Sequence, residues 1–182
     1  MGDPGMPPRA EDMFRHLDDL RTDSFEGTGP RPERIELFRT GVELLGPVVR
    51  RVLKEADATF LAGAGELAEH GVTQEGGDWT ARWQLSWPKQ RAATPIRGRV
   101  DRVGPVEVVA WFGGTFTHPH LAGSWAGQQP LVAHWPLQVT GQADAERQEP
   151  IVRAIVEAEL HQRVFEAGWR ILPGYPHRSA GE

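Results

Sequence analysis

One stretch of alternating residues constrains the fold more than any other part of the sequence. Between Trp79 and Trp87, tryptophan, alanine or leucine occupies every second position, and polar residues occupy the positions between them. Side chains two apart in an extended chain point to the same face of a sheet. The alternation therefore predicts a strand with one buried face, and a protein with a β-sheet at its centre.

A pattern of helical period precedes this strand. Apolar residues recur at alternating steps of three and four from Ile35 to Ala56, which predicts an amphipathic helix packed on the sheet. Gly46-Pro47 interrupts the stripe, and an interior proline removes a helical hydrogen bond. We therefore expect either a kink or two consecutive helices, 32–45 and 47–58. A shorter helix is expected at 10–21, with its apolar side formed by Met13, Leu17 and Leu20.

The remaining elements complete a mixed architecture. Further strands are expected at 66–74, 95–102, 106–112 and 131–140, and a long helix from about Asp144 to Ala167. The apolar run 106–112 indicates a central strand, Pro136 indicates an edge strand, and Pro150 marks a kink or the true start of the helix. The prediction is an α+β fold: an antiparallel sheet of four to five strands, with N-terminal helices and one long C-terminal helix packed on one face.

Length and composition set the broad class of the protein. The 182 residues predict one domain, expected over 9–172, between a disordered leader at 1–8 and a tail at 173–182. No apolar run reaches the roughly 18–20 residues that span a bilayer. The first residues lack the apolar core of a signal peptide, so a cytoplasmic location is expected. Eighteen of the 20 basic residues are arginines, which we interpret as the codon bias of a GC-rich bacterial genome.

Charge and cysteine content exclude several functions. With no cysteine in the chain, a disulfide, a thiolate nucleophile and a cysteine-ligated metal are all excluded. The net charge is −5 and no basic cluster occurs, which argues against nucleic acid as a partner. A small molecule is therefore the expected partner, and nothing in the sequence indicates an oligomeric state.

The chemistry of the chain is expected between Trp111 and Trp135, where histidines gather. His118 and His120 flank Pro119, and His134 follows a glycine-rich connection. A residue before proline is extended, and residues two apart then share a face. Three neutral imidazoles with an open position would suit zinc or iron(II). The alternative is a structural turn in which His118 and His120 bond the loop backbone.

The C-terminal helix offers a carboxylate as the second candidate. Glu159 falls near the middle of an apolar arc that includes Ile155 and Val156, and a buried carboxylate usually has a partner. It is expected to serve the histidine site as a ligand, a general base or an acceptor for a histidine N–H. The alternative is a structural ion pair with Arg97 or Arg99.

Tryptophans form the third candidate, a wall for a flat ligand. Trp83, Trp111, Trp125 and Trp135 could line one cavity beside the sheet and bind a small aromatic or apolar molecule. The alternative is that these large side chains fill the core between the sheet and the helices.

Three families share features with the sequence. The His118-Pro119-His120 motif resembles the metal motif of cupins, but no glutamate follows within LAGSWA at 121–126. The order of helix, meander, His-Pro turn and Trp135-Pro136 resembles ubiquitin-conjugating folds, which without a cysteine implies a scaffold only. The sheet followed by a long helix resembles helix-grip domains that bind lipids or polyketides. No family is assigned.

Together these features favour a small enzyme over other functions. No glycine-rich nucleotide loop and no Gly-x-Ser-x-Gly elbow occurs in the sequence, which argues against a nucleotide-driven enzyme or a serine hydrolase. The expectation is a small bacterial enzyme acting on a small aromatic or apolar molecule, with His118 and His120 central and a divalent metal as a candidate cofactor. A non-catalytic binding module and a scaffold domain are the alternatives.

Overall fold

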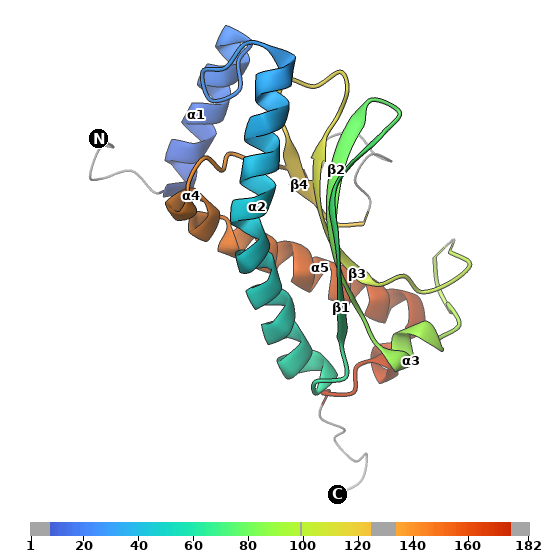
Figure 1. Cartoon of the computed structure of the whole chain (residues 1–182). Helices are drawn as coiled ribbons and strands as arrows, with labels where there is room; N and C mark the ends of the chain where they lie inside the picture. Colours follow the sequence, from blue (N-terminus) through green and yellow to red (C-terminus); the bar gives the residue numbers. More distant parts are fainter. Residues whose placement is uncertain (1–7, 99, 125–133, 176–182) are drawn as a thin grey trace, which may run out of the picture.

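The structure, a computed structural model, describes residues 8–98, 100–124 and 134–175. Two helices, α1 and α2, come first, the strands of a sheet follow, and further helices end the fold (Figure 1). In chain order the elements are α1 (Pro8–Thr22), α2 (Arg31–Ala56), the π-helical turn η1 (Asp57–Leu61), β1 (Glu66–Glu75), β2 (Asp78–Ser86), α3 (Pro88–Arg91), β3 (Val106–Phe112), β4 (His120–Ala122), β5 (Trp135–Pro136), α4 (Gln142–Arg147), α5 (Glu149–Ala167) and the 3₁₀ turn η2 (Trp169–Ile171).

The five strands form one antiparallel meander in the order β1-β2-β3-β4-β5. β3 lies at its centre and is buried at every residue, as the apolar run 106–112 predicts. β5 lies at the edge, where its Pro136 removes no ladder bond that the sheet needs. The predicted α+β fold, with a long C-terminal helix packed on an antiparallel sheet, is confirmed.

The main core lies between one face of the sheet and the helices α2 and α5. The alternating residues of β2 supply this face, as the alternation of 79–87 predicts: Ala81, Trp83 and Leu85 are buried while Arg82 and Gln84 are half-buried. Leu45 of α2 and Val152 of α5 belong to the same cluster. The apolar face of the strand and the apolar faces of the helices therefore pack together in one layer.

The helix α2 runs without a break through Gly46-Pro47, so of the two expected arrangements the single helix is found. Pro47 cannot donate a hydrogen bond to the carbonyl of Glu43. The apolar stripe on both sides of it is buried, including Leu45, Val48 and Val49, and this packing outweighs the lost bond.

The expectation of a strand at 95–102 is wrong. No strand occurs among the described residues of this range. The backbone N–H groups of Ile96 and Arg97 both donate to the carbonyl of Glu166, near the end of α5. The segment is therefore held by the carbonyl of a helix end, and its alternating arginines give the appearance of a strand without a sheet partner.

The C-terminal part of the structure agrees with the sequence-based predictions in its main features. Pro150 lies in the first turn of α5, so it marks a true start, and Gly168 ends that helix with a φ of 84°. The expected strand 131–140 shrinks to Trp135–Pro136, while residues 131–133 lie outside the described residues. The predicted leader falls almost wholly outside them as well.

The helix α1 lies against the body with its polar side. Met13, Phe14, Leu17 and Leu20 are exposed, whereas Asp19 is only 6% exposed. The Asp19 carboxylate accepts hydrogen bonds from the Ser24 hydroxyl at 3.0 Å and from the backbone N–H of Glu26 at 2.8 Å. Bonds to the following loop thus set the rotation of α1, in place of the apolar side that the sequence suggested.

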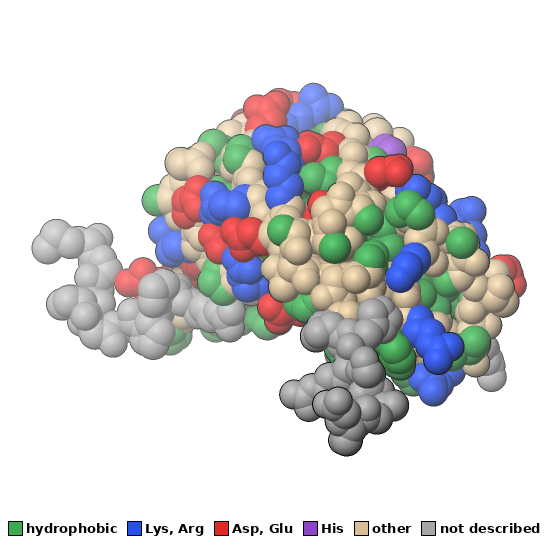
Figure 2. Space-filling model, turned by 90° about the horizontal axis from the view of Figure 1, so that it is seen from below, with side chains coloured by type: hydrophobic (Ala, Val, Ile, Leu, Met, Phe, Trp, Pro, Cys, Tyr) green, Lys and Arg blue, Asp and Glu red, His purple; other side chains and the backbone are tan. Residues whose placement is uncertain are grey.

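The surface mixes charges of both signs. On the face that Figure 2 shows, acidic and basic side chains stand side by side over much of the molecule. No helix among the described residues is long and apolar enough to cross a membrane.

Candidate functional site

Four histidines from separate parts of the chain form a row beside β3 and β4, which we call the histidine row. Its members are His118 in the turn before β4, His16 on α1, His120 at the start of β4 and His134 just before β5. The ring centroids of His16 and His118 are 4.6 Å apart, those of His16 and His120 are 6.5 Å apart, and those of His120 and His134 are 6.1 Å apart. The structure therefore brings the three predicted histidines together and adds a fourth.

Two arginines at the start of α2 hold the turn that carries His118. The Arg31 guanidinium donates to the carbonyls of Phe116 at 2.7 Å and Gly113 at 3.0 Å. The Arg34 guanidinium donates to the carbonyl of Thr117 at 3.5 Å. Because arginine offers several donors in a fixed plane, two side chains satisfy three carbonyls and fix the position of the turn.

Aromatic rings enclose the row. The Trp111 ring lies 5.8 Å from His120 and 5.7 Å from His134, centroid to centroid. The Phe25 ring lies 5.9 Å from His118. The indole N–H of Trp111 donates to the Asp78 carboxylate at 3.2 Å, so the polar atom of this tryptophan is satisfied away from the histidines.

Burial keeps these imidazoles neutral. Desolvation lowers the pKa of His118 to about 4, with the neighbouring His16 as a second cause. It also lowers the pKa of His120 to about 4, with His134 as the second cause. The pKa of His16 and of His134 is lowered by burial as well. At neutral pH the row is therefore uncharged.

Each imidazole keeps one buried nitrogen without a hydrogen-bond partner among the described residues: Nδ1 of His16, Nε2 of His118, Nδ1 of His120 and Nδ1 of His134. The other nitrogen of His118 shares a 2.6 Å hydrogen bond with the Thr117 hydroxyl. Its Nε2 lies 3.8 Å from the Asp19 carboxylate, too far for a hydrogen bond. A buried polar atom without a partner is uncommon in a folded protein, and here four of them occur in one row.

The histidines are not arranged around a common point. Within the described ranges, no three histidine, aspartate or glutamate side chains are placed to hold a metal ion. Neutral imidazoles with free nitrogens are the right donors for zinc or iron, so the chemistry of the row suits such an ion better than its present geometry does.

Glu159 belongs to a different part of the molecule from the histidines. Its carboxylate accepts a bond from the Arg163 guanidinium at 2.7 Å and one from the backbone N–H of Glu107 at 3.2 Å. Burial raises the pKa of this carboxyl. Glu107 and Trp111 stand four residues apart on β3, which in a strand is about 13 Å. The structure thus confirms burial of Glu159, and its ion-pair partner within the described residues is Arg163. Arg97 does not pair with it, and Arg99 lies outside the described residues.

A glycine makes room for this carboxylate where β4 ends. A Cβ atom at Gly123 would lie 2.6 Å from Oε1 of Glu159. β4 pairs with β3 only from Val109 to Trp111, so Glu107 has no partner there on β4. The glutamate oxygen takes the place that a strand carbonyl would have.

The tryptophans do not line one cavity. Trp83 lies in the main core, whereas Trp111 is paired opposite Thr80 and so lies on the other face of the sheet. Trp135 is 37% exposed at the edge, and Trp125 lies outside the described residues. For Trp83 the core role is the one found, and of the described tryptophans only Trp111 has a ring contact with the histidine row.

Sequence reasoning missed His16 and Asp19. Both lie on α1, about 100 residues before the His-Pro-His turn, and the apolar residues of that helix pointed to its other side as the buried one. The sequence did carry one indication. Asp19 lies shortly before a loop whose Ser24 hydroxyl and two backbone N–H groups can donate to its carboxylate.

No model of a protein family, no curated protein and no solved structure matches this chain. The meander with helices on one face is not the barrel that a cupin resemblance implies. The resemblances to ubiquitin-conjugating folds and to helix-grip domains are supported by none of these comparisons, and neither family is assigned.

Proposed function

We propose that the protein is an enzyme for a small aromatic or apolar molecule, with the histidine row as its site. The observation that supports this most is the group of four neutral imidazoles that each keep an unpaired buried nitrogen. Trp111, Phe116 and Phe25 supply apolar rings beside them. Aromatic walls with a few converging polar atoms are typical of small-molecule sites.

The lowered pKa values define what such imidazoles can do. With a pKa of about 4, His118 and His120 are weak bases at neutral pH. A neutral imidazole still offers an N–H donor and a lone pair, and it can polarise a carbonyl group or pass a proton along a chain of donors and acceptors. The proposed role of His120, which has His16 and His134 on either side, is such a relay.

A divalent metal is the second form of this proposal. The unpaired nitrogens favour it, and it requires the imidazole rings to turn so that three of them face one point. Zinc or iron would then polarise the bound molecule or activate a water molecule. Its binding would weaken as the pH falls, because a protonated imidazole cannot coordinate.

The first experiment is elemental analysis of the purified protein, before and after incubation with zinc and with iron(II). Near-stoichiometric metal that is lost in both His118→Ala and His120→Ala, and retained in His70→Ala, supports the metal form. His16→Ala belongs with the test variants, because the structure places it in the row.

The second experiment records the NMR signals of the histidine rings while small aromatic carbonyl compounds, benzaldehyde and acetophenone, are added. Binding at the row should shift the signals of His118, His120 and Trp111 together. His161, which is exposed on α5, should not respond. Protein that binds neither metal nor any such compound would count against the enzyme, and a scaffold domain would then be the better description.

A further inference from the structure

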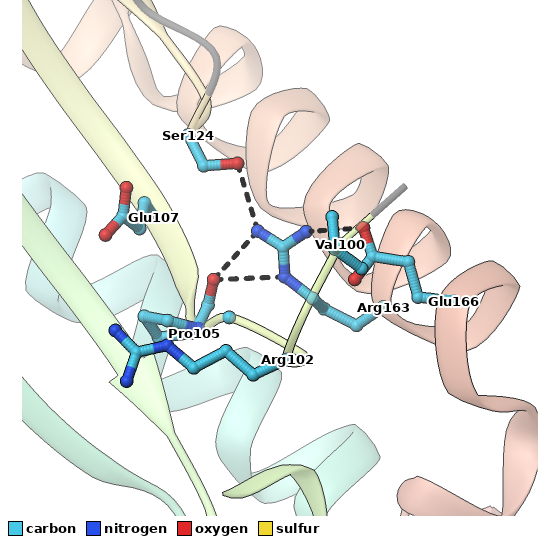
Figure 3. A pocket seen from close by; sticks show the side chains of 8 residues that line it. Val100, Arg102, Pro105, Glu107, Ser124, Arg163 and Glu166 are labelled. Atoms are coloured by element: carbon cyan, nitrogen blue, oxygen red, sulfur yellow. Dashed lines mark hydrogen bonds and ion pairs between the residues drawn. The ribbon is translucent and has the colours of Figure 1, made fainter. Parts of the chain in front are cut away.

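A second site is suggested by a hollow at the opposite end of β3 from the histidine row. The hollow measures about 250 Å³, and its walls include Arg102, Glu107, Ser124, Arg163 and Glu166 (Figure 3). The side chains come from α5, from the start of β3 and from the segments that flank it. The nature of the charges around this hollow carries the inference.

Buried acids outnumber buried bases here. Glu107, Glu159 and Glu166 are all buried, and the only buried base among the described residues that contacts them is Arg163. The Glu107 carboxylate accepts a hydrogen bond from the Gln84 amide, and the half-buried Arg82 approaches it at 3.8 Å. Because an uncompensated buried charge is costly, the two carboxylates that share Arg163, those of Glu159 and Glu166, call for a further positive group.

Each of the three nitrogens of the Arg163 guanidinium has an acceptor. Arg163 donates to the carbonyl of Pro105, to the Ser124 hydroxyl and to Glu159. It reaches Glu166 only at 3.5 Å. Figure 3 shows the bonds of Arg163 to Pro105, Ser124 and Glu166. Arg163 therefore pairs with Oε1 of Glu166 at this longer distance, and Oε2 of Glu166 receives no bond from it.

One carboxylate oxygen is left over. Glu166 is 1% exposed and lines the hollow, and its Oε2 has no hydrogen-bond partner among the described residues. Its Oε1 accepts from Gln162 at 2.9 Å. The last torsion of a glutamate is soft, so the carboxylate can turn Oε2 toward a donor in the hollow without movement of the helix.

We propose that this hollow binds a small organic cation, an aliphatic amine, whose N–H groups bond Glu166 and Glu107. An ammonium group supplies three donors and one positive charge. A volume of about 250 Å³ equals roughly eight water molecules at about 30 Å³ each, which limits the ligand to a short chain. Arg102 lines the same hollow and forms no ion pair with either carboxylate within the described part of the chain.

The test uses putrescine as the probe and 1,4-butanediol as its uncharged counterpart, measured by calorimetry on the full chain. Putrescine should bind and butanediol should not. Glu166→Gln should lower the affinity for putrescine at least tenfold while the thermal midpoint stays close to that of the wild type. Glu107→Gln should act in the same direction, and it decides the matter if Glu166→Gln does not fold.

A matched control separates the hollow from general attraction to an acidic protein. Glu43→Gln makes the same change of charge on the exposed side of α2, and it should leave the affinity unchanged. Equal affinity in the Glu166 and Glu43 variants would overturn the proposal, as would equal binding of putrescine and butanediol. The histidine signals should be unaffected by putrescine, so this outcome is independent of the proposed enzyme.

Discussion

His118 and His120 make the stability of this protein depend on pH. Burial lowers the pKa of each to about 4 in the folded chain, against about 6.5 in the unfolded chain. The unfolded state therefore binds more protons below about pH 6.5. We predict that the free energy of unfolding falls between about pH 6.5 and 4, by on the order of 2–3 kcal/mol for each imidazole, as measured by urea unfolding.

The matched variant for this prediction is the double substitution His118→Gln and His120→Gln. Glutamine does not titrate, so the slope of stability against pH from 7 to 5 should become shallower than in the wild type. His161→Gln, on an exposed position of α5, should keep the slope of the wild type. Identical slopes in all three proteins would mean that the two imidazoles are open to water.

Among the residues beside the hollow at the start of β3, Arg163 is the one whose loss should cost the most stability. Its replacement by glutamine leaves Glu159 and Glu166 buried without their cation, at a cost of about 3–5 kcal/mol. The deficit should shrink as the pH is lowered toward 5, because burial already raises the pKa of Glu159 and protonation removes its uncompensated charge. Chemical denaturation at pH 7 and pH 5 measures both effects, and Arg21→Gln, in an exposed pair with Asp18, is the control.

The same geometry makes Glu159→Gln a milder change. Arg163 then keeps Glu166, and one of three buried carboxylates loses its charge. A loss of stability as large as that of Arg163→Gln would show that the acids are not in excess, and it would weaken the case for a bound cation.

At the scale of elements, α2 buries its leucine Leu45, whereas α1 exposes its leucine Leu17. Leu45 of α2 is 0% exposed and Leu17 of α1 is 49% exposed. Leu45→Asp buries a charge without a partner, so it should cost several kcal/mol, on the order of 4, and unfold much of the protein. Leu17→Asp should change stability by less than about 1 kcal/mol.

Thermal unfolding of these two variants is a direct check of how α1 lies. If Leu17→Asp proved as harmful as Leu45→Asp, the apolar side of α1 would be part of the core and the polar contacts of Asp19 would be secondary. A stable Leu45→Asp protein would remove α2 from the core.

Periodic segments were predictable because many residues repeat one signal. The strand β2 (Asp78–Ser86) and the helix α2 (Arg31–Ala56) follow from apolar patterns that only one face of the sheet or helix can satisfy. Short or irregular elements were not predictable. β4 has three residues, and the segment at 95–102 depends on a helix-end carbonyl that no local pattern reveals.

At the scale of the whole molecule, the residues after α5 connect the end of β2 with the turn that follows α2. The indole N–H of Trp87 donates to the carbonyl of Ile171 at 2.6 Å, and the N–H of Gly174 donates to the carbonyl of Phe60 at 2.8 Å. Ile171 and Leu172 are buried. The residues that sequence analysis took as the end of the domain are thus part of its core.

Two truncations test this arrangement. A chain that ends at residue 168 loses two buried side chains, worth about 1.5–3 kcal/mol each, and its thermal midpoint should fall by roughly 10 °C. A chain that ends at residue 175 keeps both side chains and should melt within about 2 °C of the full protein. Equal midpoints for the two shortened chains would show that the contacts of Ile171 and Leu172 contribute little.

The candidate site was only half predictable, for a reason that lies in the tertiary structure. The spacing of His118, His120 and His134 placed them near each other, since they lie in or directly before the neighbouring strands β4 and β5. His16 comes from a helix far away in the sequence, and only the rotation of that helix brings its ring to the row. Glu159 was correctly expected to be buried, but its distance from the histidines depends on the point at which β4 ends.

The close approach of Gly123 to Glu159 has a consequence for the evolution of this protein. A methyl group at 123 would lie 2.6 Å from Oε1 and 3.1 Å from Cγ of that glutamate, so position 123 is not free to change while the glutamate is in place. In descendants of this chain, an alanine or larger residue at 123 should be found only where 159 has already become a shorter side chain. Substitution at 159 would come first, and the two sites would then appear as a covarying pair.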